Sequence, residues 1–141
     1  MNILIAVDGS EYTKKATAYV ASSPEWQRPD LKIHLLHVEP AVASPRARAF
    51  LGNDAVNNFY REESLAALAA AETILRDKNI PFQSSYEVGD IAECIQGYVE
   101  QHGIDMVVMG SHGHGHLKSV VLGSVATKVL AASSVPVLIV R

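Results

Sequence analysis

Five short runs along the chain have the hydrophobic pattern of strands. Three of them are continuously apolar: Ile3–Val7, Met106–Met109 and Val137–Val140. Parallel strands that are covered on both faces have this character. The runs Lys32–Val38 and Phe82–Val88 alternate apolar with polar side chains instead. The second of these two is the more polar, and we expect it to form an edge of the sheet.

Segments with the spacing of amphipathic helices lie between these runs. They cover Glu11–Ser23, about Asp54 to Lys78, Asp90–His102 and Ser124–Ala132. Ser10 precedes the first segment as an N-cap, and Gly103 follows the third, where glycine commonly ends a helix. Strand and helix therefore alternate over residues 1–141. This order predicts a single α/β domain, a doubly wound parallel sheet with helices on both faces.

Residues 39–57 are the one long stretch without either periodicity, and we expect them to be irregular. They contain Pro45 and Gly52, and also the arginines Arg46 and Arg48. A connection of this length is either a solvated loop or a functional lid. The sequence leaves both interpretations open.

Composition and charge narrow the class of protein. The 141 residues are 48% hydrophobic and 19% charged, which suits a globular domain and excludes a disordered chain. The formal charge of −3 gives no electrostatic reason to bind nucleic acid or an anionic membrane. A single cysteine, Cys94, excludes a framework of disulfides within the chain. No signal peptide and no apolar run of about 20 residues is visible, so we expect a cytoplasmic protein.

The segment from Gly110 to Ser124 carries the candidate chemistry. Two residues separate Gly110 from Gly113, and nine more precede Gly123 and Ser124, which open the last helical segment. Glycine allows close approach to main-chain N–H groups, and a helix N-terminus offers unpaired donors with partial positive charge. The pattern lacks the Gly-Lys-Ser/Thr of a P-loop and the spacing of the dinucleotide-binding fingerprint. It predicts a phosphate site of another kind.

Nearby polar residues leave further alternatives. His112, His114 and His116 alternate as metal ligands in an extended segment would, but no carboxylate or thiol lies near them in sequence. We therefore assign no metal ligands. Asp8 ends the first apolar run, where it either forms an Asx-turn or helix cap, or contacts a nucleoside or a divalent ion.

The motifs together resemble the universal stress protein family. The resemblance rests on Asp8-Gly9-Ser10, on Leu36-His37-Val38, on the Gly-x2-Gly-x9-Gly-Ser pattern and on the closing Ser134–Arg141. It covers the chain from Met1 to Arg141. In this family the glycine pattern marks the ATP-binding branch. The resemblance also implies the strand order 3-2-1-4-5 and a homodimer paired through the last strand.

The resemblance implies a role for twelve residues in binding ATP, with or without Mg²⁺. Ala6, Val7, Asp8 and Val38 would form the adenine end, and Met109 would pack beside the base or the ribose. Gly110, Ser111, His112 and Gly113 would line the ribose and phosphates, and Gly123, Ser124 and Val125 would hold the terminal phosphates. No catalytic residue is assigned.

Three functions agree with this interpretation. The leading one is a stress or signalling factor that alternates between ATP-loaded and empty states. The second is an enzyme that slowly hydrolyses ATP or transfers phosphate, and the third is a dimerising interaction module with a vestigial nucleotide site. The sequence identifies neither the stress signal nor the downstream protein partner.

Overall fold

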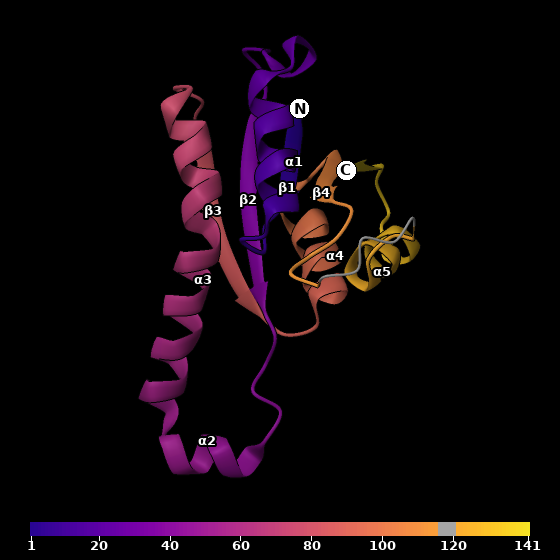
Figure 1. The fold of residues 1–141 in the computed structure, drawn as a ribbon. Coiled ribbons are helices and arrows are strands. Elements are labelled where there is room, and N and C mark those ends of the chain that lie inside the picture. The colour runs from indigo at the N-terminus through magenta and orange to yellow at the C-terminus, as the bar shows by residue number, and fades with distance from the viewer. Residues whose placement is uncertain (116–120) are drawn as a thin grey trace.

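The structure is a computed structural model that describes residues 1–115 and 121–141. In these residues the strands are β1 (Asn2–Ala6), β2 (Lys32–Glu39), β3 (Phe82–Val88), β4 (Met106–Gly110) and β5 (Val137–Val140). The helices are α1 (Glu11–Ser22), α2 (Pro45–Leu51), α3 (Asn53–Asp77), α4 (Ile91–His102) and α5 (Ser124–Ala132), with a 3₁₀ turn over Pro24–Trp26. The strands form one parallel sheet in the order β3-β2-β1-β4-β5 (Figure 1). The predicted fold and strand order are confirmed.

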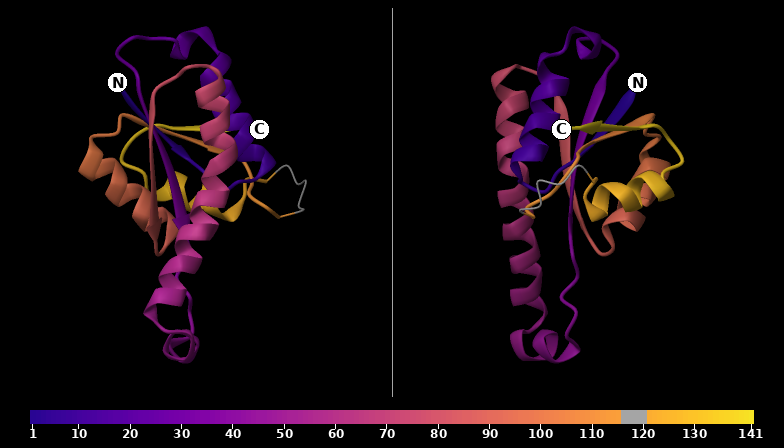
Figure 2. Two further views of the ribbon diagram at one scale, coloured as in Figure 1. Left: turned by 90° about the vertical axis from the view of Figure 1, so that its left-hand side faces the viewer. Right: turned by 45° about the vertical axis from the view of Figure 1, so that its right-hand side comes forward.

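Two layers of helix enclose the sheet. Helices α1 and α3 cover one face and α4 and α5 cover the other, as the right-hand view of Figure 2 shows. Side chains of β1 alternate between the two cores: Ile3 and Ile5 point to the first and Leu4 to the second, all fully buried. The continuous apolar run in the sequence thus reflects burial on both faces.

The alternating runs have two different origins. β3 lies at the sheet edge, as predicted, and exposes its polar side chains. β2 lies between β1 and β3, and its polar residues His34 and His37 are buried. His34 meets the Tyr98 hydroxyl at 3.0 Å. Burial, reinforced by the charges of His102 and Lys32, lowers the pKa of His34.

The expectation of an irregular stretch over residues 39–57 is wrong. This stretch contains α2 and the start of α3. The Ser44 hydroxyl accepts from Ala47 N–H at 3.2 Å, and Pro45 occupies the first helical position, which are two ordinary start signals. Gly52, at φ 81°, separates the two helices. These start signals are present in the sequence, but α2 has only seven residues, too few to show helical periodicity.

Helix α3 continues beyond the sheet and, with α2, forms an arm (Figure 1). Its C-terminal half buries Leu68, Ala71 and Leu75 against the sheet. The arm carries Arg46 and Arg48 on α2, away from the glycine segment in each view (Figures 1 and 2). None of the described helices is both long enough and apolar enough to cross a membrane.

The close packing of α1 on β4 requires glycine at position 110, and this requirement can be tested. A Cβ atom at Gly110 would lie 2.6 Å from Tyr12 Cβ and 2.9 Å from the Tyr12 carbonyl carbon. Gly110→Ala should therefore force the two elements apart and lower the free energy of unfolding by about 1–3 kcal/mol in urea denaturation. Gly97→Ala, within α4 and with nothing within 4 Å of the added carbon, should stabilise by about 0.5–1 kcal/mol. Equal effects at the two positions would contradict this account of the packing.

Candidate functional site

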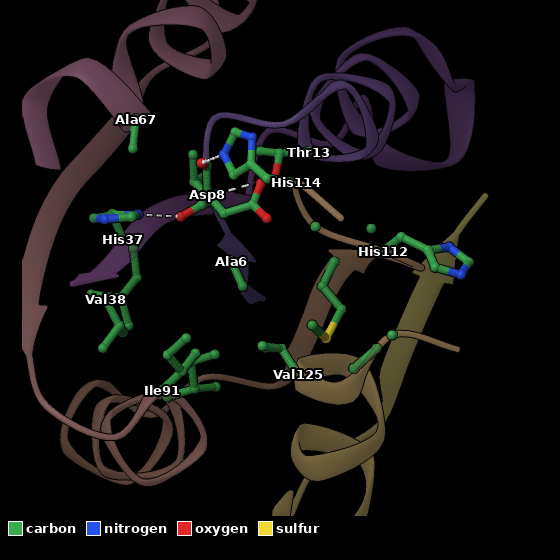
Figure 3. Close-up of a pocket in the computed structure, with 18 of the residues that line it drawn as sticks. Ala6, Asp8, Thr13, His37, Val38, Ala67, Ile91, His112, His114 and Val125 are labelled. Atoms are coloured by element: carbon green, nitrogen blue, oxygen red, sulfur yellow. Dashed lines mark hydrogen bonds between the residues drawn. The ribbon is translucent and has the colours of Figure 1, made fainter. Parts of the chain in front are cut away.

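A cavity of about 580 Å³ opens at the carboxyl ends of the central strands (Figure 3). Its position follows from topology, because β1 leads to α1 on one face whereas β4 leads to α5 on the other. Ligands of doubly wound sheets bind where neighbouring strands diverge in this way. The volume lies in the range of about 300–1,000 Å³ that is usual for small-molecule sites.

Most of the residues named from the sequence surround this cavity. Those that line it are Ala6, Val7, Asp8, Val38, Met109, Gly110, His112, Gly113, Gly123, Ser124 and Val125. The exception is Ser111, which is 1% exposed and pairs its hydroxyl with Nδ1 of His112 at 2.9 Å. Ser111 therefore supports the glycine segment from behind and does not face the cavity. The role of the other residues in binding stays a prediction.

A main-chain bond brings the two halves of the glycine pattern together. Gly123 N–H donates to the Ser111 carbonyl at 2.8 Å, so the end of β4 lies beside the start of α5. Gly123 is the N-cap of α5 and has no side chain to offer. The first bond within the helix runs from Thr127 N–H to Gly123 O, which leaves the preceding N–H groups of Ser124 and Val125 without helical partners.

Other helices that start near the cavity are capped by side chains. The Ser10 hydroxyl accepts from Thr13 N–H at the start of α1, and the Asp90 carboxylate accepts from Glu93 N–H at the start of α4. The donors of α5 lack such a cap and border the cavity. This arrangement suits an anion that replaces the missing cap.

Asp8 forms the Asx-turn that the sequence offered as one of its two roles, and its contact with a nucleoside or an ion stays a prediction. Its Oδ1 accepts from Ser10 N–H at 2.8 Å and from the Thr13 hydroxyl at 2.6 Å, which is an Asx-turn with a further anchor. Its Oδ2 lies 2.8 Å from the position of a Cβ on Gly113. The carboxylate is thus fixed by one oxygen, while the other borders the glycine segment and the cavity.

The two described histidines of the glycine segment, His112 and His114, bond to different main-chain carbonyls. His112 Nε2–H donates to Val121 O at 2.7 Å, whereas His114 Nε2–H donates to Asp8 O at 2.6 Å. Their rings point in different directions in Figure 3. Among the described residues no three His, Cys, Asp or Glu side chains gather around a possible ion. His116 and Lys118 lie outside the described residues.

Apart from Val38, the lining contributed by β2, α3 and α4 was not predicted from the sequence. The additional residues include His37, Glu39, Pro40, Glu63, Ala67, Ile91 and Ile95. In Figure 3, Val38 and Ile91 form an apolar wall on the side opposite His112. The alternation of the second strand drew attention to His37 but gave no reason to place it in a site. Ala67 and Glu63 come from the middle of a long helix, where no local motif marks them.

His37 and Glu39 form a pair beside this wall. His37 Nδ1–H donates to the Val7 carbonyl at 2.7 Å, and Nε2 lies 2.8 Å from Glu39 Oε2. The His37 ring is buried, and Glu39 is partly exposed to the cavity. A carbonyl oxygen can only accept, so Nδ1 carries the proton in the bond to Val7.

The charge around the cavity is uneven. Asp8, Glu39 and Glu63 line it, and among its described lining residues there is no lysine or arginine. A bound anion would therefore depend on main-chain N–H groups and on the dipole of α5, at the end away from Glu39 and Glu63. The apolar wall, Glu39 and Glu63 mark the opposite end, whereas the Asp8 carboxylate lies beside Gly113.

Comparison with known sequences gives a consistent family assignment. The model of the universal stress protein family matches residues 1–141. Universal stress protein YxiE of Bacillus subtilis is 32% identical, over 99% of this chain and 97% of its own length. Universal stress protein Slr1230 of Synechocystis is 31% identical over 99% of this chain, but the chain spans only 42% of that longer protein.

Solved structures of similar proteins share the fold. MJ0577 of Methanocaldococcus jannaschii is 28% identical with a TM-score of 0.79, covering 99% of this chain and 94% of that one. A universal stress protein of Archaeoglobus fulgidus, solved with dAMP, is 18% identical with a TM-score of 0.72, covering 100% of this chain and 98% of that one. Other family structures hold cAMP or AMP. Because the family model matches every residue and YxiE matches along almost its whole length, the chain belongs to the universal stress protein family.

Proposed function

We propose that this protein binds ATP in the cavity at the carboxyl edge of the sheet and acts as a nucleotide-dependent stress or signalling factor. The observation that carries the proposal is the uncapped N-terminus of α5, which borders the cavity beside the glycine segment. Several family structures hold adenine nucleotides, which supports the class of ligand. The cytoplasmic location expected from the sequence remains a prediction.

The phosphates would lie against Gly113 and the first turn of α5. N–H groups of Ser124 and Val125 and the Ser124 hydroxyl would bind phosphate oxygens. Hydrogen bonds to a charged group contribute about 1.5–3 kcal/mol each, and association and ordering costs offset much of this. Without a lysine or arginine in the described lining, we expect affinity in the micromolar range.

The adenosine would lie toward the apolar wall. Val38, Ile91 and Met109 line a space suited to a flat aromatic ring. The Glu39 carboxylate can accept hydrogen bonds from a ribose hydroxyl or from an exocyclic amine, but it would repel phosphate. The charge and the shape of the cavity therefore favour the same orientation, with the base at the apolar wall and the phosphates at α5.

Mg²⁺ would be held chiefly by the phosphates. This ion usually keeps several waters and takes one or two carboxylates besides phosphate oxygens. Asp8 fits such a role because its Oδ2 borders the glycine segment while Oδ1 is anchored. The ion would supply charge neutralisation at the phosphates.

A homodimer paired through β5 completes the proposal. β5 forms the edge of the sheet, and its side chains are half-buried. Val107 N–H bonds to Pro136 O and Ser111 N–H to Val140 O, so the alternation of the strand turns the N–H and C=O of Ile139 away from β4. Such outward groups are a template for pairing with a second copy.

The first prediction tests the nucleotide site. Gly113→Val should press against the Asp8 carboxylate and fill the phosphate end, weakening ATP binding by at least about tenfold, or about 1.4 kcal/mol. Isothermal titration calorimetry measures the change, with circular dichroism as the check on folding. Gly97→Val, on α4 with open space around the added carbon, is the matched control and should bind normally. Unchanged ATP affinity in Gly113→Val would rule out this site and favour the interaction module with a vestigial pocket.

The second prediction concerns hydrolysis. Fast phosphoryl transfer needs a cationic group at the transferring phosphate and a residue that orients the nucleophile. The described lining holds no lysine or arginine to supply that cationic group, and Arg46 and Arg48 lie on the distant arm. Purified protein should turn over ATP at about 10⁻² s⁻¹ or less in a coupled phosphate-release assay. A rate near about 10 s⁻¹, the ordinary enzyme median, that disappears in Ser124→Ala would establish the enzyme alternative.

The third prediction concerns the dimer. Ile139→Pro removes an N–H group that faces away from β4, so the strand should keep its place in the sheet while pairing with a partner is lost. Sedimentation equilibrium at micromolar concentration should give a dimer for the unmodified protein and a monomer for this variant. Ile139→Ala keeps the N–H group and serves as the control, which should remain dimeric. A monomeric unmodified protein, with and without ATP, would refute the proposal.

A further inference from the structure

Strand β3 forms the second edge of the sheet, opposite β5. Among the described residues it pairs with β2 alone, in an unbroken register that runs from Phe82 opposite Ile33 to Val88 opposite Glu39. The left-hand view of Figure 2 looks onto this edge, with α3 on one side of β3 and α4 on the other. Proteins commonly blunt an edge strand with lysine, proline or a bulge, and β3 contains none of the three. It therefore keeps the regular geometry that a further strand needs.

The main-chain groups of three β3 residues face outward. Gly89 N–H donates to Glu39 O at 3.0 Å, just beyond the end of β3, so this N–H points toward β2. Because the N–H and C=O groups alternate in direction along a strand, those of Ser84, Tyr86 and Val88 point away from β2. They have no hydrogen-bond partner in the described part of the chain. The edge therefore offers donors and acceptors at the spacing of an extended peptide.

The two faces of this edge differ chemically. On the α3 face, Tyr86 and Val88 are 39% and 37% exposed, although both side chains are large and apolar. They share this face with Phe82, which packs against the core beneath α1 and α3. On the α4 face lies Glu87, whose carboxylate interacts with the Cys94 thiol of that helix. Successive residues of an added strand would therefore meet an apolar surface and an acidic one in turn.

Further carboxylates gather at the end of β3. Burial raises the pKa of the Cys94 thiol, and the carboxylates of Glu87, Asp90 and Glu93 raise it further, so all three lie within electrostatic reach of one thiol. Residues 79–117 include no lysine or arginine that could offset this charge. A run of charge is usually no more than a solvated face, but this one adjoins unpaired main-chain groups. The edge is thus complementary to a cationic strand.

We propose that β3 is a docking edge for an extended segment of a partner protein in which apolar and basic residues alternate. The apolar side chains would contact Tyr86 and Val88, and the lysines or arginines between them would face Glu87 and the carboxylates that follow it. In such strand addition the main-chain bonds give affinity and the alternate side chains give specificity. The proposal does not depend on nucleotide binding.

Like charge disfavours a second copy of this chain at the same edge. Pairing of β3 with β3 would bring Glu87, Asp90 and Glu93 of both copies close together, where they repel. The four residues of β5 are all apolar and carry no such charge. The two edges of the sheet therefore suit different partners.

The test uses a fluorescein-labelled octapeptide of alternating valine and lysine as the probe. A peptide of alternating valine and glutamate keeps the backbone and the apolar positions but reverses the charge. Tyr86→Pro removes an outward N–H group and leaves the ladder to β2 intact, and Tyr86→Val, which keeps that N–H group, is its matched control. The triple variant Glu87→Gln, Asp90→Asn, Glu93→Gln removes the charges, and asparagine can still cap α4.

The first measurement is fluorescence anisotropy. The unmodified protein should bind the valine–lysine peptide at least about tenfold more tightly than the valine–glutamate peptide. Tyr86→Pro should lose at least about tenfold in affinity, whereas Tyr86→Val should retain it. The triple variant should bind more weakly and with less dependence on salt. Equal affinity for the two peptides, or unchanged affinity in Tyr86→Pro, would overturn the proposal.

The second measurement is amide hydrogen exchange by NMR, which needs no variant. Without peptide, the amides of Ser84, Tyr86 and Val88 should exchange at least about tenfold faster than those of Ser85 and Glu87, which face β2. Saturating valine–lysine peptide should slow the three outward amides and leave the other two unchanged. Binding without this alternation would reveal a non-specific effect of charge and overturn the proposal.

The same spectra distinguish a second copy from a basic partner. If the outward amides of β3 became protected as the concentration of protein alone was raised, and sedimentation showed a species larger than a dimer, β3 would pair with another copy of this chain. That result would also overturn the proposal.

Discussion

The site depends on one topological constraint: β1 and β4 are neighbours in the sheet, yet the helices that follow them cover opposite faces. The segments that follow β1 and β4 therefore diverge at the centre of the carboxyl edge, and a cavity stays open between them. Close approach of α1 to the end of β4, made possible by Gly110, limits how far it opens. A cavity of about 580 Å³ results without any insertion or second domain.

The two ends of the cavity differ in the polar groups that line them. Near α5 there are main-chain donors but, in the described lining, no cationic side chain. Near β2 there are the carboxylates of Glu39 and Glu63 and an apolar wall. A phosphate at the α5 end would be held by main-chain donors and the helix dipole.

Much of the architecture could be predicted because it rests on local patterns. Apolar runs such as Ile3–Val7 are long enough to identify, and a glycine directly after such a run commonly marks a tight turn or close approach of a ligand. The short helix α2 was not predicted because seven residues are too few to show helical periodicity. The family resemblance placed Ser111 in the site because it lies within the glycine motif. In the structure its side chain is buried and does not line the cavity. The place of His37 beside the cavity could not be predicted. It depends on the register that brings His37 to the Val7 carbonyl, 30 residues away in the sequence.

Because the N–H groups at the start of α5 belong to the main chain, they are present whatever side chain occupies those positions. Mutation cannot delete a peptide N–H except by introducing proline. Evolution can therefore alter the walls of this cavity widely while the hydrogen-bonding pattern within it persists. Selection would act instead on the few residues that fix the path of the backbone, among them Gly110, Gly123 and His37. Sequence divergence across such a site is consequently a poor guide to divergence of its ligand.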